Sequence, residues 1–362
     1  MTQLRHRCPK NAVMHKGQSR YNRWPRSRAG GQPMRRRDFV TLIGGGAAAA
    51  WPLLARGQQG ERVRRIGVLM HVEVDDREGQ RRFSAFRQGL QQLGWIDGTN
   101  LHIDTRWGAN APDRRRYAAE LVALTPDVIL ASTTLAMVAL QQTTSTVPIV
   151  FANVTDPVGA GFVESLAQPG GNVTGFTTFE FSTSAKWLEL LKEIAPHVTR
   201  AIVIRDPAIA SAVSQFAVIQ SAAHTSGLDV SPVGARDPAE IERAITHFLR
   251  PIDGGLIVTA SAFGLAERDT LVAIAAKYHL PAVYPFDYFV SGGGLVSFGP
   301  DSVNQYRQAA TYIDRILRGE KPSELPVQAP TKYKLAINLK TAKALGIDVP
   351  LSLIARADEV IE

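Results

Sequence analysis

The sequence has almost no cysteine, and outside its first residues it has no excess of positive charge. Cys8 is the only cysteine of 362 residues, so an intramolecular disulfide and a zinc site built from thiolates are both excluded. Residues 1–57 hold 12 Lys or Arg against one acidic residue, whereas residues 58–362 hold 29 Lys or Arg against 32 Asp or Glu. Because the body of the chain is mildly acidic, it lacks a basic footprint, and we expect no nucleic-acid partner.

Motifs for catalysis and metal binding are also missing. The patterns Gly-x-Ser-x-Gly, Walker A and His-Glu-x-x-His do not occur. The histidines after residue 58 are scattered and have no metal-ligand spacing to one another. We therefore expect no catalytic residue, no metal and no cofactor.

The start of the chain has the pattern of an export signal. Arg35–Arg37 precede a weakly apolar run over 39–55, which ends in small residues suited to cleavage near Gly57. Pro52 interrupts this run, and the run is too short to favour a membrane span. The order Arg-Arg-Asp-Phe-Val at 36–40 resembles the twin-arginine signature. We predict a disordered extension or mis-assigned start over 1–33, a twin-arginine-like signal over 34–57, and a periplasmic mature protein.

Short apolar runs alternate with amphipathic segments throughout residues 58–362. Ile66–Met70 predicts a buried strand, and the apolar residues that follow share one helix face up to Gly94. Repetition of this pattern predicts parallel sheets covered by helices on both faces, which is an α/β fold. The chain is long enough for two domains. We predict two Rossmann-like lobes over 58–180 and 181–300, a return segment over 301–362 that packs mainly on the first lobe and a hinge, and helices that include 162–167 and 265–278.

Several segments resemble one known family. The strongest is Pro148–Thr177, which contains VTDPVGA and PGGNVTG in the expected order, and GGLVSFGPD at 293–301 and ILRGEKPSELPVQAP at 316–330 extend the likeness. The chain resembles the ABC transporter substrate-binding family that includes tryptophan/tyrosine-type binding proteins. This resemblance implies a type I periplasmic-binding-protein architecture with a hinge, a small-molecule ligand, and an ABC transporter permease as partner. We expect a monomer that meets the membrane only through that permease.

Ligands of parallel α/β sheets bind beyond the carboxyl ends of the strands, where loops lead into helices. Ser132-Thr133-Thr134 opens a predicted helix, and its hydroxyls and free backbone N–H groups favour a carboxylate there; an ordinary helix cap is the alternative. Asp156 is suited either to a ligand ammonium or to the turn at Pro157. The predicted ligand-binding residues are His71, Ser132, Thr133, Thr134, Asn153, Thr155, Asp156, Thr178, Phe179, Thr259, Ser261 and Asp287.

The loop at 258–263 departs from the family pattern. Tryptophan/tyrosine-like members usually carry Thr-Asp-Asn character there, and this chain reads Val-Thr-Ala-Ser-Ala-Phe. The loop therefore supplies no acidic partner for an α-amino group. Phe179, Tyr284 and Phe286 either stack on an aromatic ligand or pack in the core.

Three functions remain open from the sequence. The first is the periplasmic solute-binding component of an ABC importer. It captures a small molecule between the lobes, one that carries a carboxylate and could be an amino acid or an aromatic compound. The second is an α/β enzyme that acts on a small molecule. The third is a ligand-sensing regulator of the same fold, which needs a helix-turn-helix within residues 1–60, where the signal-like run lies instead.

Overall fold

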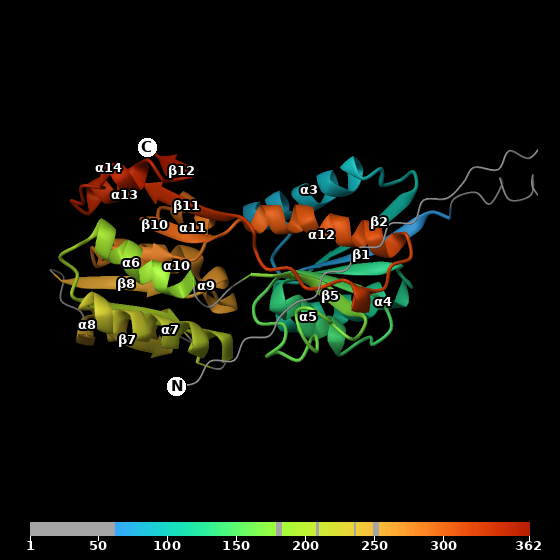
Figure 1. Ribbon diagram of the computed structural model, residues 1–362, viewed down its shortest axis with the longest axis horizontal. Helices are drawn as coiled ribbons and strands as arrows, with labels where there is room; N and C mark the ends of the chain where they lie inside the picture. Colours follow the sequence, from blue (N-terminus) through green and yellow to red (C-terminus); the bar gives the residue numbers. More distant parts are fainter. Residues whose placement is uncertain (1–61, 179–182, 208–209, 235–236, 249–252) are drawn as a thin grey trace, which may run out of the picture. The chain divides into compact units, whose positions relative to one another are not determined.

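The computed structural model describes residues 62–178, 183–207, 210–234, 237–248 and 253–362 (Figure 1). The predicted extension over 1–33, the predicted signal over 34–57 and Phe179 lie outside the described residues. In the described ranges no helix is both long and apolar enough to cross a membrane. Two sheets, each flanked by helices, make this an α/β protein with two lobes.

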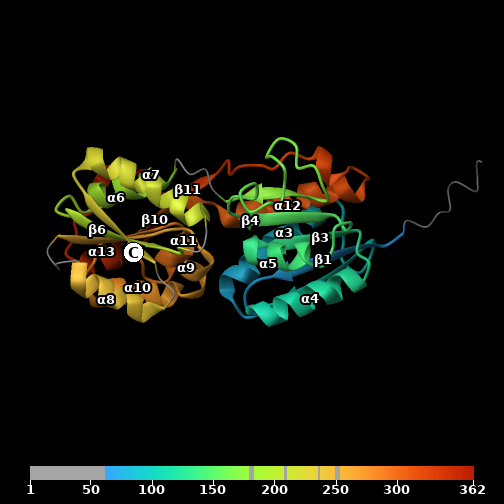
Figure 2. The same ribbon diagram turned by 90° about the horizontal axis from the view of Figure 1, so that it is seen from below.

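The first lobe is built on a five-stranded, wholly parallel sheet with the order β2-β1-β3-β4-β5. Its strands β3, β4 and β5 are buried along their whole length, as strands covered on both faces must be. Helices α3 and α12 lie side by side on one face, and α4 and α5 cover the other (Figures 1 and 2). The elements are β1 (Arg64–Met70), α3 (Arg77–Gln92), β2 (Leu101–Trp107), α4 (Ala111–Ala123), β3 (Val128–Ser132), α5 (Thr133–Gln141), β4 (Ile149–Val154), β5 (Val173–Thr177) and α12 (Ser302–Leu317).

The second lobe is built on a seven-stranded sheet with the order β12-β11-β10-β9-β8-β6-β7. Every pair of neighbouring strands is parallel except β10 and β11. Helices α6 and α7 cover one face, and α8 and α10 cover the other (Figure 2). The elements are α6 (Ser184–Ile194), β6 (Arg200–Arg205), α7 (Ala210–Ser226), β7 (Asp229–Gly234), α8 (Pro238–Phe248), β8 (Gly254–Val258), α9 (Ala262–Ala266), α10 (Arg268–Lys277), β9 (Ala282–Tyr284), α11 (Asp287–Ser291), β10 (Val296–Pro300), β11 (Tyr333–Asn338), α13 (Leu339–Ala344), α14 (Leu351–Ile354) and β12 (Glu359–Ile361).

The return segment 301–362 divides between the lobes, so the prediction that it packs mainly on the first lobe is wrong for its second half. Helix α12 and the short 3-10 helix η2 (Pro322–Glu324) pack on the first lobe. Strand β11 instead pairs with β10, and β12 pairs with β11. Leu335 and Ile337 explain this placement, because both are buried in the same hydrophobic core of the second lobe as Trp187. Burying these side chains also covers an otherwise open sheet edge.

The chain passes between the lobes three times. The passages fall between Thr177 and Ser184, between β10 and α12, and between Leu325 and Tyr333. Because so few connections join the two lobes, the lobes can turn relative to each other about a hinge. Two Rossmann-like lobes joined in this way form the predicted architecture of type I periplasmic binding proteins.

Two predicted helices differ from the structure. Residues 162–167 form bends, with Phe162 and Val163 buried on the first lobe, and Gly161 just before them has a positive φ of 71° that a helix does not allow. The helix predicted over 265–278 is two helices, α9 and α10, separated at Glu267, whose φ and ψ are −100° and 19°. A short helix, α11, follows β9 and was not predicted.

Candidate functional site: a cavity between the two lobes

A cavity of about 310 Å³ lies where strands of both lobes end. Its volume is at the lower end of the range of small-molecule sites, roughly 300–1,000 Å³. Most of the polar side chains in its wall come from the first lobe, and much of the apolar surface comes from the second. The lining residues are His71, Arg82, Thr133, Thr134, Leu135, Asn153, Thr155, Asp156, Gly159, Ala160, Thr178, Ser211, Ala260, Ser261, Leu265, Phe286 and Tyr288.

The structure brings most of the residues predicted from the sequence to this one cavity. They lie at or just beyond the carboxyl ends of five different strands, which agrees with the rule that sites form there. The residues on the wall are His71, Thr133, Thr134, Asn153, Thr155, Asp156, Thr178 and Ser261.

Three other predicted residues do not line the cavity. Thr259 is fully buried, and its hydroxyl donates to the Ile204 carbonyl at 2.8 Å. Asp287 accepts a hydrogen bond from Lys334 of β11 at 3.2 Å. Ser132 lies behind the wall, where it is fully buried. All three residues lie near the end of a strand in the sequence, but hydrogen bonds to residues far away in the chain turn their side chains away from the cavity.

Three residues of the wall have a left-handed backbone, which strains one of them. Thr133, Asn153 and Asp156 have positive φ values of 76°, 56° and 50°. Asn and Asp adopt this region routinely, whereas a β-branched residue such as Thr133 avoids it. Such strain persists where the surrounding structure enforces it, and it is concentrated at functional sites.

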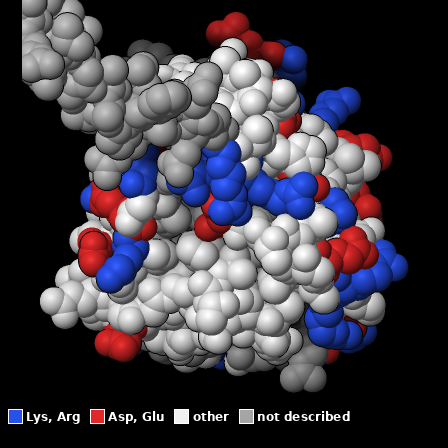
Figure 3. Space-filling model, turned by 90° about the vertical axis from the view of Figure 1, so that its right-hand side faces the viewer, with Lys and Arg blue, Asp and Glu red and all other residues white. Residues whose placement is uncertain are grey.

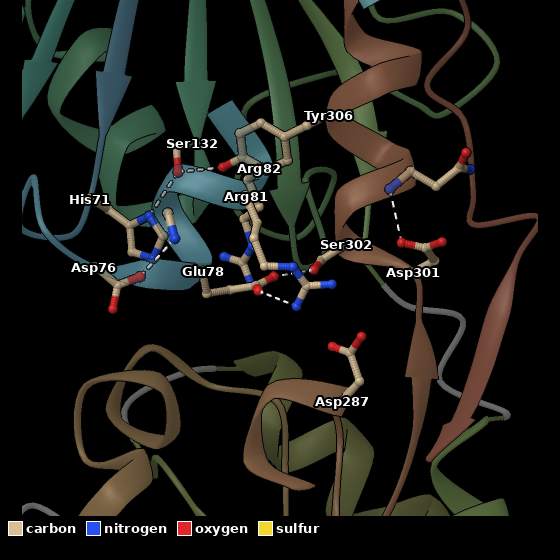
Figure 4. A network of polar contacts seen from close by, with 12 residues as sticks. His71, Asp76, Glu78, Arg81, Arg82, Ser132, Asp287, Asp301, Ser302 and Tyr306 are labelled. Atoms are coloured by element: carbon tan, nitrogen blue, oxygen red, sulfur yellow. Dashed lines mark hydrogen bonds and ion pairs between the residues drawn. The ribbon is translucent and has the colours of Figure 1, made fainter. Parts of the chain in front are cut away.

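A chain of buried polar side chains supports the wall from behind (Figure 4). The Nδ1 atom of His71 lies 2.7 Å from the Ser132 hydroxyl oxygen. Tyr306 of α12 donates to that same oxygen at 2.5 Å. Because the Ser132 hydroxyl is engaged in this way, it makes no capping bond to α5, and the first N–H groups of that helix lack a side-chain acceptor from it.

His71 is held in its neutral form. Burial, and then the positive charges of Arg82 and Arg114, lower the pKa of His71 from 6.5 to about 3. Asp76 opposes this shift but is outweighed. At neutral pH the imidazole is therefore an uncharged hydrogen-bonding group.

Four buried polar atoms of the cavity wall have no hydrogen-bond partner among the residues that the structure describes. They are His71 Nε2, Thr133 Oγ1, Asn153 Oδ1 and Thr178 Oγ1. The side chains of His71, Asn153 and Thr178 are more than nine-tenths buried. An unpaired buried polar atom costs about 1–3 kcal/mol, so a native protein keeps four of them together only where something else satisfies them.

Arg82 is a wall residue that the sequence analysis missed. It is buried, and its Nε donates to Glu78 at 3.0 Å. Glu78 also accepts from Ser302 of α12 at 3.1 Å (Figure 4). The spacing of Glu78 and Arg82, four residues apart on α3, was the available signal, but such pairs are usually exposed and of little energetic importance.

The wall of the second lobe is largely apolar. Phe286 and Tyr288 stack with ring centroids 5.3 Å apart and planes inclined by 16°, and Leu265 and Ala260 extend this surface. The sequence left open whether Phe286 and Tyr284 meet a ligand. Phe286 lines the cavity, whereas Tyr284 is fully buried and stacks on Phe289 in the core.

Charge elsewhere on the molecule is mixed. On the face shown in Figure 3, Lys and Arg side chains are interspersed with Asp and Glu. Ion pairs on the first lobe, such as Arg64–Asp127 at 2.9 Å and Arg106–Glu120 at 2.9 Å, follow the same pattern. Within the part of the chain that the structure describes, no three His, Cys, Asp or Glu side chains gather in a way that would hold a metal ion.

Two lobes around a partly polar, partly apolar cavity define a solute-binding protein. The chain belongs to the ABC transporter substrate-binding protein family, whose model matches residues 65–361. This is a family of solute-binding proteins, and it implies a small-molecule ligand and a transporter permease as partners. The family that matches is one neither of enzymes nor of regulators.

Three proteins are similar to this chain, and the descriptions of two of them name a ligand. A tyrosine-binding protein of Clostridioides difficile (strain R20291) is 28% identical over 283 residues, which are 78% of this chain and 81% of that protein. An ABC domain from Streptococcus pneumonia, solved in complex with L-Trp, is 26% identical with a TM-score of 0.74 over 82% of this chain and 99% of that one. A conserved domain protein from Vibrio cholerae O1 biovar eltor is 30% identical with a TM-score of 0.73, over 83% of this chain and all of that one.

Proposed function

We propose that the cavity binds an aromatic amino acid or a closely related aromatic carboxylate, which the protein delivers to its permease. The observation that carries this proposal is the division of the cavity wall: unpaired polar atoms lie on the first lobe, and stacked aromatic rings lie on the second. A ligand with a polar head and a flat apolar body matches both walls at once. The tyrosine-binding relative and the L-Trp complex support the same class of ligand.

The ligand carboxylate is assigned to the start of α5. The helix begins without a side-chain cap, and its dipole and free N–H groups favour an anion. His71 Nε2 and Thr133 Oγ1, both unpaired, lie in the same wall.

The ligand ammonium is assigned to Asn153 and Asp156. Asn153 Oδ1 is an unpaired acceptor in the wall. One oxygen of Asp156 accepts from the Gly159 N–H at 2.8 Å, so this residue serves its turn with one oxygen while the side chain remains part of the wall. These acceptors on the first lobe take the place of the acidic partner that the loop at 258–263 lacks.

Calorimetry with L-tryptophan and L-tyrosine, and with the amides of both, tests this assignment. We expect the free acids to bind, and the amides to bind roughly ten- to a hundredfold more weakly, because a hydrogen bond to a charged group contributes about 1.5–3 kcal/mol. Equal affinity for acid and amide would reject the anion site. Binding of neither acid at millimolar concentration would reject the ligand class.

We also propose that the twin-arginine-like segment exports the protein to the periplasm with cleavage near Gly57. The family membership and the Arg36-Arg37 pair support this route. Mass spectrometry of the periplasmic protein should find a mature start near Gln58. Replacing Arg36 and Arg37 by Lys should stop export, and unchanged export would indicate a different route.

A further inference from the structure

We propose that Tyr306 and Ser132 are positioning residues that hold the His71 imidazole with its hydrogen on Nε2, so that the ligand must place a hydrogen-bond acceptor against that atom. The inference rests on the proposed function of the cavity as the ligand site. Tyr306 belongs to α12 and lies 174 positions after Ser132 in the chain, and its side chain points toward Ser132 and His71 (Figure 4).

The direction of each hydrogen bond in the row His71, Ser132, Tyr306 follows from Arg82, which lies beyond Tyr306. The positive Arg82 guanidinium, which can only donate hydrogen bonds, acts electrostatically on Tyr306 and favours the orientation with the hydroxyl oxygen toward it. The hydroxyl hydrogen of Tyr306 is then free for Ser132, 2.5 Å away. Ser132 receives that hydrogen and gives its own to His71 Nδ1, 2.7 Å away. A neutral imidazole that accepts at Nδ1 carries its hydrogen on Nε2.

The opposite tautomer leaves a buried hydrogen without an acceptor. If Nδ1 carried the hydrogen, the Ser132 oxygen would accept it. Ser132 and Tyr306 share one hydrogen bond, so one of their two hydroxyl hydrogens would then need another acceptor, and among the described residues neither hydroxyl, both fully buried, has one. A buried donor without a partner is disfavoured, so the packing selects the first arrangement.

The charges around His71 keep it from becoming an imidazolium. The positive charges that act on His71 belong to Arg82 of α3 and Arg114 of α4, and the negative charge belongs to Asp76, which precedes α3. The hydroxyls of Tyr306 and Ser132 complete the polar surroundings. Because the ring is buried and two cations face it against one anion, it remains a neutral donor through the pH range in which a periplasmic protein works.

The chemical consequence is a requirement on the ligand. The same cavity wall contains the His71 Nε2–H group and the uncapped start of α5, so it offers a ligand two kinds of N–H donor. An oxygen with lone pairs, such as one from a carboxylate, satisfies both. A ligand that presents an ammonium or an N–H group there is rejected, because donor would face donor.

Nitrogen-15 NMR of the ligand-free full-length protein, labelled at histidine, tests the tautomer directly. We expect His71 to have a protonated Nε2 and a bare Nδ1 at pH 6 and pH 8. In Tyr306→Phe the Ser132 hydroxyl is free to donate or accept, and we expect both tautomers to appear. Tyr312→Phe is the matched control: it removes a hydroxyl from the same helix that bonds the Pro326 carbonyl at 2.6 Å, and it should leave the His71 signals unchanged. A protonated Nδ1 in the wild type overturns the proposal.

Affinity for L-tryptophan supplies the second arm. His71→Leu removes the donor, and we expect the Kd to rise roughly ten- to a hundredfold. His71→Gln places an amide N–H near the position of Nε2 and should hold the Kd within about threefold of the wild type. Equal losses in the two variants overturn the proposal. If the wild-type protein binds neither L-tryptophan nor L-tyrosine, the proposed function fails, and the NMR result decides the tautomer by itself.

Discussion

His71 joins the cavity wall to the interior, and its protonation has a consequence for stability. Its pKa falls from 6.5 to about 3 because it is buried and faces Arg82 and Arg114. Between those two values the unfolded chain binds a proton that the folded protein does not. The contribution of His71 to the free energy of unfolding therefore decreases as the pH falls, by about 1.4 kcal/mol per pH unit.

His71→Gln removes this proton linkage. We expect the wild type to lose stability more steeply than His71→Gln between pH 6 and pH 4, by at least about 1 kcal/mol over that range, which is about a third of the roughly 2.8 kcal/mol of a full linkage. Urea unfolding at a series of pH values measures the difference. His102→Gln, at a half-exposed histidine on β2, controls for the loss of an imidazole elsewhere in the first lobe. Parallel pH profiles of wild type and His71→Gln would contradict a depressed pKa.

Among the helices of the first lobe, α5 differs from its neighbours at its start. Asp76, Asn110 and Asp301 cap α3, α4 and α12 by accepting a backbone N–H of the first turn. Ser132 does not do so for α5. A bound carboxylate would supply the missing acceptor.

Ligand binding should therefore protect the first turn of α5 from hydrogen exchange. With L-tryptophan at saturation, we expect amide exchange over residues 134–136 to slow markedly, because the N–H groups gain an acceptor. Residues 113–115 of α4, already capped by Asn110, are the internal control and should exchange at the same rate with or without ligand. Equal slowing in both helices would indicate a general stabilisation instead of a carboxylate at α5.

At the scale of the whole molecule, an ion pair between described residues joins the lobes beside the cavity. Arg268 of α10 donates to Asp76 at 2.8 Å, and both side chains are largely buried. Arg82 also lies over the Tyr288 ring at 5.4 Å. These contacts exist only while the lobes are close, so they favour the closed form over the open one.

Asp76→Asn should shift this balance without harming α3, since Asn caps a helix as well as Asp does. We expect loss of the ion pair to cost the closed form about 1 kcal/mol. Small-angle scattering of the ligand-free protein should then give a larger radius of gyration, and the Kd for the ligand should rise about fivefold. Asp127→Asn breaks the Arg64–Asp127 pair within the first lobe and should leave the radius unchanged. A radius that stays the same in Asp76→Asn would show that other contacts set the closure.

The sequence by itself determined the α/β class, the two lobes and the strand ends at which the cavity lies. Apolar runs such as Ile66–Met70 and the hydroxyls after β3 are local patterns, and local patterns fix which backbone forms strands and where polar loops follow. Tertiary structure alone decided that Arg82, Leu265 and Tyr288 join the wall, and that Thr259 and Asp287 turn away from it. It also decided the hydrogen bonding of His71, because Tyr306 reaches Ser132 only when α12 packs back onto the first lobe. Contacts between residues so far apart in the chain leave no periodic signal along it, and only packing brings their atoms together.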